Sequence, residues 1–433
     1  MEKEYQVIRS QIIRVMAEVG HVVLERENEI HAVMLALLSN TDGAIVGEGG
    51  IAKSQMMRTI LGKRPGEGRI TDAHCYMTTL NAGVRPQDLW SSGVGVNRTD
   101  LGEGQVTVDY KPRLDGRGAD PKVRALYFDE YSMAPEGTQE SIRSALSDRE
   151  AYVMGEYLDL DHVWSVWITT NVLPKGPLNW RLVCKLEASE VAQEANQLKM
   201  MVSSDLRKKL ARARKRGGAD AADELFLAEL SLWEQDQEMT KKYIERLFEI
   251  LQNPARVTLE EFESFRDVAA RVQVPGTVLR EQIAIRSELE ARGIHIDGRR
   301  FVRTIPMVRA HAALVRGAMT AGVEDLVIMQ HAWADPGESR AFREVVFEHA
   351  NPIAAEAEKL VDAAIIAAEN AIQSADPRNG RMAIGKIKQE ILPQFPSLLE
   401  KASQQGLPSA DVKAAQSRVQ EQIQKVAKEL MGL

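Results

Sequence analysis

A glycine-rich stretch that ends in lysine and serine is the first place where residue types and spacing suggest chemistry. It lies between the apolar run 44–46 and the segment 55–61, and it reads Gly47, Glu48, Gly49, Gly50, Ile51, Ala52, Lys53, Ser54. A buried strand, a glycine-rich turn and a helix start, in this order, gather backbone N–H groups around an anion. Lys53 would add a mobile charge and Ser54 would ligate Mg²⁺. The stretch therefore predicts a phosphate-binding loop, although Ala52 stands where the usual pattern has glycine.

Two adjacent carboxylates follow a second apolar run, residues 123–128. An Asp at the carboxyl end of a strand beside a phosphate loop is the usual second protein contact for Mg²⁺, and Asp129 has that position. Glu130 is placed to polarise a water for attack on a γ-phosphate, which is general-base chemistry. A strand that simply ends in an acidic turn is the alternative for this pair.

An amide follows a third apolar run, residues 163–170. Asn171 at the tip of that strand can hold the attacking water or sense the γ-phosphate, and the alternative is a turn starter. Three strand ends with matching chemistry, in this order along the chain, predict hydrolysis of ATP or GTP with Mg²⁺.

The three motifs together resemble the MoxR group of AAA+ ATPases. They read GEGGIAKS, LYFDEYSMAPEGTQESIRSALSDREAYVMG and WITTNVLP. Within that group the chain is most similar to the RavA-type branch, the regulatory ATPase variant A. The similarity covers residues from about 15 to 336, with an interruption between the core and the lid.

The resemblance implies a separate role for each residue of the nucleotide site. Lys53 and Ser54 would hold phosphate and Mg²⁺, and Asp129 would ligate the metal. Glu130 would activate the attacking water, and Asn171 would be the first sensor of the γ-phosphate.

The same resemblance gives roles to residues on either side of these motifs. Glu25 and Arg26, in the lead-in segment 23–30, would border the nucleotide base. Arg181 would be an arginine finger that reaches into the neighbouring subunit's site and stabilises charge on the transferring phosphoryl group. Its alternative is a solvated or ion-paired surface arginine.

In the lid, Arg299 would report the nucleotide state in cis. Arg300 and Arg303 are close enough in sequence to take that place instead. Arg149 lies in a predicted turn at residues 147–150, and we expect it to be structural although it could also face a partner subunit.

The expected fold class is α/β, a P-loop AAA+ αβα core with an α-helical lid and additional α-helical segments. A chain of 433 residues exceeds what one hydrophobic core usually supports. The predicted parts are the core at 1–183, a helical insertion with a basic run at 184–256, the lid at 257–336, and a C-terminal α-helical region at 337–433.

Two segments of the core predict β-hairpins. Residues 151–160 alternate short apolar positions around a glycine. Residues 93–120 are rich in Gly, Asp and Arg, and they suit a hairpin or loop that touches a client in the pore. A surface excursion without a role is an equally good interpretation of that longer segment.

The helical additions carry two further signals. The run 207–216 is strongly basic, and we interpret it as a solvated hairpin face, with nucleic-acid binding as the alternative. In the last helix Val412, Val419 and Val426 form a narrow apolar seam for another helix of the same chain. The segment 338–373 predicts one long helical stretch. RavA-type proteins carry a small β module in this region, and the sequence gives no sign of one.

Composition limits the class of protein. The chain is 44% hydrophobic and 27% charged, with a net charge of −7, so it has no general attraction for nucleic acid or anionic membranes. Cys75 and Cys184 lack metal-ligand spacing, and disulfides are not expected. We find no signal peptide and no apolar run of membrane-spanning length, so a cytoplasmic location is expected.

The predicted function is that of an ATP-hydrolysing ring, expected to be a hexamer because an arginine finger is useful only in trans. The resemblance implies remodelling or activation of a protein client beside a partner with a von Willebrand factor A domain. The alternatives are a nucleic-acid motor or loader, and a nucleotide-switched scaffold that scarcely turns ATP over. The intact Asp129–Glu130 pair argues against the scaffold.

Overall fold

The structure, a computed structural model, describes residues 2–47, 53–64, 66–102, 105–114, 117–174, 176–187, 238–404 and 409–431, with the single residues 196, 199, 206, 209, 210 and 212. The chain forms two compact units. The first contains residues 1–13, 31–189 and 256–346, and the second contains residues 14–30, 190–255 and 347–433. Residues 14–30, which fall within the predicted core, belong to the second unit. The predicted division into core, insertion, lid and C-terminal region stays a prediction.

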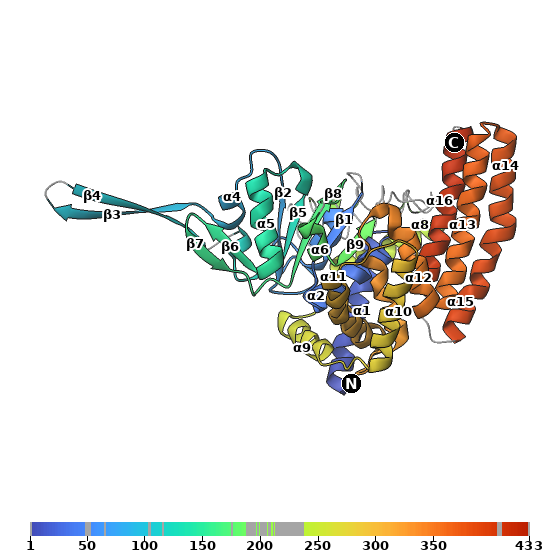
Figure 1. The fold of residues 1–433 in the computed structure, drawn as a ribbon, viewed down its shortest axis with the longest axis horizontal. Helices are drawn as coiled ribbons and strands as arrows, with labels where there is room; N and C mark the ends of the chain where they lie inside the picture. Colours follow the sequence, from blue (N-terminus) through green and yellow to red (C-terminus); the bar gives the residue numbers. More distant parts are fainter. Residues whose placement is uncertain are drawn as a thin grey trace. The chain divides into compact units, whose positions relative to one another are not determined.

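A five-stranded parallel sheet forms the centre of the first unit (Figure 1). Its order is β2-β5-β8-β1-β9, with strands β1 (Gly43–Val46), β2 (His74–Thr79), β5 (Val123–Asp129), β8 (Ser165–Thr170) and β9 (Cys184–Glu187). Every residue of β1 and β8 is buried, as expected for parallel strands covered on both faces. The three strands predicted from the sequence are β1, β5 and β8, and they are adjacent in the sheet.

Helices precede, connect and follow these strands. Two of them, α1 (Lys3–Val22) and α2 (Glu27–Leu38), pass from one unit into the other. The core helices are α3 (Lys53–Ile60), α4 (Pro86–Trp90), α5 (Glu136–Asp148) and α6 (Pro177–Arg181). The lid region contains α9 (Leu259–Ala270), α10 (Gly276–Ala291) and α11 (Gly298–His311), followed by the short helices η3 (Ala312–Arg316) and η4 (Val323–His331). This parallel sheet with its helices confirms the predicted α/β class.

Both predicted hairpins are present. The pair β6 (Glu150–Val153) and β7 (Glu156–Asp159) forms one, and the pair β3 (Val94–Gly102) and β4 (Gln105–Pro112) forms the other. Figure 1 shows β3 and β4 as a long ribbon that projects away from the central sheet. The Lys111 ammonium lies 3.6 Å from the Glu156 carboxylate, so an exposed ion pair connects the two hairpins.

The central sheet extends beyond the predicted end of the core at residue 183. Cys184 pairs with Gly43 and Lys185 with Ala44, which makes β9 an edge strand of the sheet. Lys185, the second residue of β9, interrupts the run of apolar residues by which a buried strand is recognised in a sequence. The Lys185 side chain is fully buried, and its ammonium donates to the backbone oxygens of Leu182 at 2.7 Å and Trp333 at 2.8 Å. Burial lowers the pKa of this lysine well below its usual value.

The C-terminal part of the second unit is a helical bundle. Its elements are α13 (Pro352–Gln373), α14 (Pro377–Lys386), η6 (Ile387–Ile391), η7 (Leu392–Gln394), α15 (Phe395–Gln404) and α16 (Ala410–Met431). Val412, Val419 and Val426 of α16 are fully buried, and the first two belong to the bundle core. The predicted seam therefore packs within the chain. Among the described residues after 338, the structure contains no strand.

The predicted single helical stretch at 338–373 is two helices. The first, α12 (Ser339–Ala350), ends before Asn351, whose side-chain oxygen accepts a hydrogen bond from the Ala354 N–H at 3.2 Å. Pro352 then occupies the first position of α13, where its missing N–H costs nothing. The described part of the second unit also contains the long helix α8 (Glu238–Gln252). No helix in the described part of the chain has the length and apolar character to cross a membrane.

Candidate functional site

The predicted phosphate and sensor residues lie at one edge of the central sheet, where β1 and β8 end. Val46 pairs with Thr170 in parallel register, and the Gly47 N–H donates to the Thr170 oxygen at 3.3 Å. Asn171 directly follows Thr170 and is exposed. The structure therefore brings the start of the glycine-rich loop next to the predicted sensor.

Lys53 begins α3 at the same edge. Its ammonium donates to the Gly47 oxygen at 2.7 Å, across the loop that the two residues enclose. Burial lowers the pKa of Lys53, and the negative charges of Asp129 and Glu130 oppose that shift. The lysine is thus within the electrostatic field of both predicted carboxylates. The loop residues Glu48, Gly49, Gly50, Ile51 and Ala52 lie outside the described residues.

The two predicted metal ligands are a hydroxyl and a carboxylate. Ser54 is half-buried at the second position of α3, and Asp129 is half-buried at the end of β5. The Thr169 hydroxyl donates to Oδ1 of Asp129 and so holds the carboxylate in one orientation. Hard oxygen donors of this kind are those that Mg²⁺ prefers, with phosphate oxygens and waters completing its shell. The residues present fit a nucleotide-bound Mg²⁺.

Glu130 occupies a left-handed backbone conformation, with φ 56° and ψ 45°. A non-glycine residue seldom adopts this conformation unless its surroundings hold it there. The Glu130 N–H donates to the Thr169 hydroxyl oxygen at 3.2 Å, and its side chain is exposed. One hydroxyl therefore contacts both residues of the acidic pair.

Sequence reasoning missed Thr169. The sequence offered one signal for Thr169, a hydroxyl side chain in a mostly apolar strand, two residues before Asn171. Thr169 is buried in β8, and β8 lies next to β5 in the sheet.

Glu25 and Arg26 belong to the second unit. Glu25 joins α1 to α2 with a positive φ of 56°, and its carboxylate accepts a hydrogen bond from the Asn196 amide at 2.9 Å. Arg26 is buried and lies 3.6 Å from the Glu29 carboxylate. Their predicted place beside the nucleotide base stays a prediction.

Arg149 lies near the amino ends of β1 and β8, opposite the strand ends that carry the phosphate loop, and it has a structural role, as expected. Its guanidinium makes two hydrogen bonds to the Asp42 carboxylate, at 2.7 and 3.2 Å. Asp42 directly precedes β1 and also accepts from the Val166 N–H at 2.8 Å. This ion pair, in which Asp42 is buried and Arg149 half-buried, joins the end of α5 to the beginning of β1 and β8.

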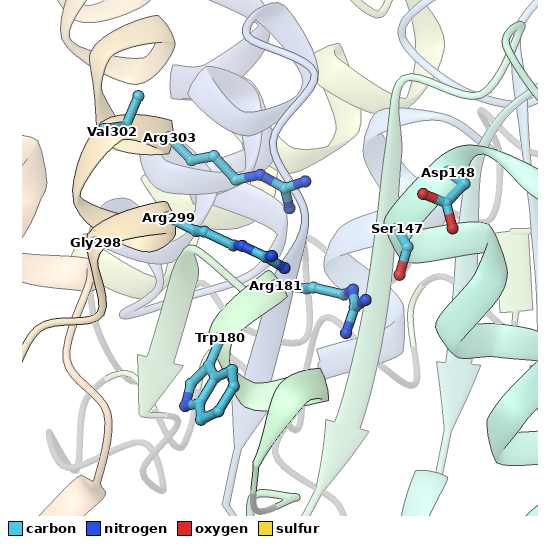
Figure 2. Close-up of a pocket in the computed structure, with 8 residues that line it drawn as sticks. All are labelled: Ser147, Asp148, Trp180, Arg181, Gly298, Arg299, Val302 and Arg303. Carbon is cyan, nitrogen blue, oxygen red and sulfur yellow. The ribbon is translucent and has the colours of Figure 1, made fainter.

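A cavity of about 500 Å³ in the first unit gathers three arginines. It is lined by Arg181 of α6, by Arg299 and Arg303 of α11, and by Ser147 and Asp148 of α5, with Trp180 beside them. Figure 2 shows the three arginine side chains extending toward the wall formed by Ser147 and Asp148.

This cavity lies near the edge where β1 begins. The N–H groups of Val183 and Cys184 each donate to the Asp42 oxygen at 3.1 Å, which places Arg181, two residues earlier, near the start of β1. Lys53 instead contacts Gly47, beyond the end of β1. Four residues of strand separate the two edges by roughly 13 Å. Arg299 lines the same cavity as the predicted finger, and its expected action in cis stays a prediction.

Arg300 points away from this cavity. Its guanidinium donates to the Asn179 backbone oxygen at 3.0 Å, to the Asn179 side-chain oxygen at 3.2 Å and to the Ala332 oxygen at 3.4 Å. It is buried, and burial lowers its pKa to about 10. Arg299 and Arg303 are exposed, so of the three candidate lid arginines only Arg300 is committed to packing.

Comparison with known proteins adds evidence on the fold. No protein-family model matches the chain. It is 21% identical to uncharacterized protein MJ0079 of Methanocaldococcus jannaschii over 360 residues, which is 83% of this chain and 79% of that protein. It is also 21% identical to uncharacterized protein MJ0812 of the same organism over 342 residues, covering 79% and 76% of the two chains.

Among solved structures, the chain is similar to a putative ATPase from Cytophaga hutchinsonii, with a TM-score of 0.53. The alignment covers 81% of this chain and 97% of that one, at 14% sequence identity. This similarity agrees with the α/β fold of the first unit. At this identity the similarity establishes the fold and not the activity.

Proposed function

We propose that this protein is a Mg²⁺-dependent ATPase whose chemistry takes place at the sheet edge that carries Lys53, Asp129 and Glu130. The observation that carries this proposal is the Thr169 hydroxyl, which contacts both acidic residues within the electrostatic reach of Lys53. A buried hydroxyl that orients the Asp129 carboxylate and accepts from the Glu130 backbone N–H, beside a lysine at a helix start, is suited to phosphoryl transfer. In that reaction positioning and charge stabilisation dominate catalysis.

Each residue at this edge has a distinct task in the proposed reaction. Lys53 stabilises negative charge on the terminal phosphates, and Ser54 and Asp129 would hold Mg²⁺. The bound metal supplies charge neutralisation on phosphate oxygens. Glu130 accepts a proton from the attacking water. Asn171, at the tip of β8, orients that water through its amide.

Two substitutions separate binding from turnover. Lys53→Ala should abolish ATP binding, because the lysine contacts phosphate in the ground state. Glu130→Gln should retain ATP binding and lose hydrolysis, because the carboxylate matters only when water attacks. Equilibrium binding of a fluorescent ATP analogue and steady-state phosphate release are the measurements. Near-normal phosphate release by Glu130→Gln would exclude Glu130 as the base.

We further propose a homo-oligomeric ring, with a hexamer as the expected size. Arg181 and Arg299 line a cavity on the far side of β1 from the chain's own Lys53. Both arginines would therefore serve the nucleotide held by a neighbouring subunit. This assigns the lid arginine to the same site as the finger.

The two hairpins are the proposed client-facing elements of the ring. They carry large apolar side chains exposed to solvent, namely Val94, Val96, Tyr110, Tyr152, Met154 and Tyr157. By resemblance to MoxR proteins, the client would be a protein, and a partner with a von Willebrand factor A domain would assist. Affinity capture with Glu130→Gln held in ATP tests this. Captured proteins should be lost when Tyr110 and Tyr152 are replaced by Ser, and retention of the same proteins would contradict the role of the hairpins.

A further inference from the structure

A third arginine lies in the cavity of Arg181 and Arg299, and the proposed reaction so far gives it no role. Arg299 and Arg303 are four residues apart on α11, a spacing that puts both side chains on one face of a helix. In Figure 2 both leave α11 in the same direction, and the Arg181 side chain lies beside them. Within the described part of the chain, neither the Arg299 nor the Arg303 guanidinium makes a hydrogen bond or an ion pair.

The charges around this cavity are unbalanced. Asp148 is the one carboxylate among its lining residues as described, against three guanidinium groups. Asp42 interacts electrostatically with Arg303, but its carboxylate already accepts two hydrogen bonds from Arg149 and one from the Val166 N–H. Three converging positive charges repel one another, and an anion with several negative charges would relieve that repulsion. A volume of about 500 Å³ is within the range of small-molecule sites.

The two helices that carry these arginines are tied together, and apolar side chains border the cavity. Arg300 is hydrogen-bonded to Asn179, which ties the first turn of α11 to α6. On the rim, the Trp180 side chain is 45% exposed and Val302 is 59% exposed. Exposed apolar groups beside the Arg299 and Arg303 guanidinium groups are suited to being covered by another protein surface that brings an anion with it.

We propose that Arg181, Arg299 and Arg303 form one polyphosphate-binding site, in which Arg303 is a third phosphate-contacting residue. Planar guanidinium groups bind phosphate oxygens in pairs, so three of them can contact the terminal phosphates of a triphosphate together. We expect the phosphate chain to be that of a nucleotide held by a neighbouring copy, and this expectation rests on the proposed function. A free polyphosphate has the same chemistry and is the other source.

The first arm of the test measures binding without catalysis. Inorganic tripolyphosphate is titrated calorimetrically into the Lys53→Ala protein, whose own phosphate loop is disabled. We expect binding that weakens with salt and that falls tenfold or more when Arg303→Gln is added. Arg280 is an exposed arginine of α10 outside the cavity, and Arg280→Gln should leave the affinity unchanged. Equal binding with and without Arg303→Gln would overturn the proposal.

The second arm identifies the source of the phosphate. If the neighbour's nucleotide is the ligand, Arg303→Gln alone should lower ATP turnover tenfold or more, and mixing it with Lys53→Ala subunits should restore part of that loss. If a free polyphosphate is the ligand, tripolyphosphate affinity falls while turnover is unchanged. If the protein hydrolyses no ATP but still binds tripolyphosphate in an Arg303-dependent way, the polyphosphate site is supported and the proposed ATPase function is refuted.

Discussion

Arg300 and Asn179 are joined by two hydrogen bonds, from one guanidinium nitrogen to the backbone oxygen at 3.0 Å and to the side-chain oxygen at 3.2 Å. The contact links α11 of the lid to α6, two residues before Arg181. Asn179 also donates its amide to the Ala334 oxygen at 3.0 Å. This charge-assisted contact of the buried Arg300 side chain therefore ties α11 to α6. Because Arg181 also lies on α6, the contact helps to position the predicted finger.

The first prediction concerns this contact. Arg300→Lys keeps a positive charge but loses the planar guanidinium, which contacts Asn179 through one nitrogen and the Ala332 oxygen through the other. We expect ATP turnover to fall about tenfold or more with ATP affinity unchanged, because the arginines of the cavity lose their fixed position. Steady-state kinetics and equilibrium ATP binding on the same preparation provide the measurement. A matching loss of ATP affinity would instead indicate general unfolding.

The second prediction concerns Thr169. Thr169→Val keeps the shape of the side chain and removes the hydroxyl that contacts Asp129 and Glu130. We expect turnover to fall about tenfold to a hundredfold and the Mg²⁺ concentration for half-maximal activity to rise. Thr138→Val is the control, because Thr138 is buried and donates a hydrogen bond to Val84 at 2.6 Å in another part of the unit. Each change should cost about 1 kcal/mol of stability. Equal ATPase losses in both variants would argue against a positioning role.

The third prediction tests action between subunits. Arginine fingers contribute on the order of 10³–10⁵ in rate when a neighbour supplies them. Arg181→Ala and Arg299→Ala should each bind ATP normally and hydrolyse it poorly. Mixing either variant with Lys53→Ala should restore some activity, since a site then combines one chain's loop with another chain's arginine. Mixtures that stay inactive although subunit exchange is verified would show that the arginines do not act in trans.

The fourth prediction concerns stability at low pH. Burial lowers the pKa of His31 to about 3 and also that of His331 to about 3, and both lie in the first unit. The unfolded histidines titrate near 6.5, so below that pH the unfolded chain binds more protons than the folded one. Stability should therefore fall as the pH drops from 6.5 toward 3, by up to about 2 kcal/mol per histidine at pH 5.

His31→Leu removes one of these groups. The difference between its unfolding temperatures at pH 8 and pH 5 should be a few degrees smaller than that of the unchanged protein. Measurement at pH 8 alone gives the packing cost of the substitution. An unaltered pH dependence would mean that His31 is not held neutral by its surroundings.

The fifth prediction concerns the basic run 207–216. Of this run only Lys209, Leu210 and Arg212 lie within the described residues, with Leu210 buried and Arg212 exposed. We expect it to contact protein or solvent, so any nucleic-acid binding seen at low salt should vanish near physiological salt. Replacing Arg212, Arg214, Lys215 and Arg216 with Gln should leave the ATPase rate unchanged. Nucleic-acid binding that persists at physiological salt, stimulates ATPase and is lost in this variant would favour a nucleic-acid motor.

Elements with local signals could be predicted from the amino-acid sequence. Lys53, Asp129 and Asn171 each follow an apolar strand, and a strand followed by a polar tip can be recognised within a window of about ten residues. The neighbouring order of β5, β8 and β1 then brought their tips together, as the expected fold class required. The two hairpins and the buried seam of α16 were also predictable, because alternation and helical spacing depend on nearby residues alone.

Contacts between segments that are distant in sequence could be seen in the three-dimensional structure alone. Arg299, Arg300 and Arg303 are alike in sequence, and their different orientations follow from how α11 packs on α6, with Arg300 and Asn179 separated by 121 positions. Thr169 contacts Asp129 because β8 lies beside β5 in the sheet. Lys185 can be buried in β9 because its ammonium donates to two backbone oxygens within the unit. A side chain's type and its neighbours in sequence do not specify such partners, since packing between elements fixes which face of each helix or strand becomes buried.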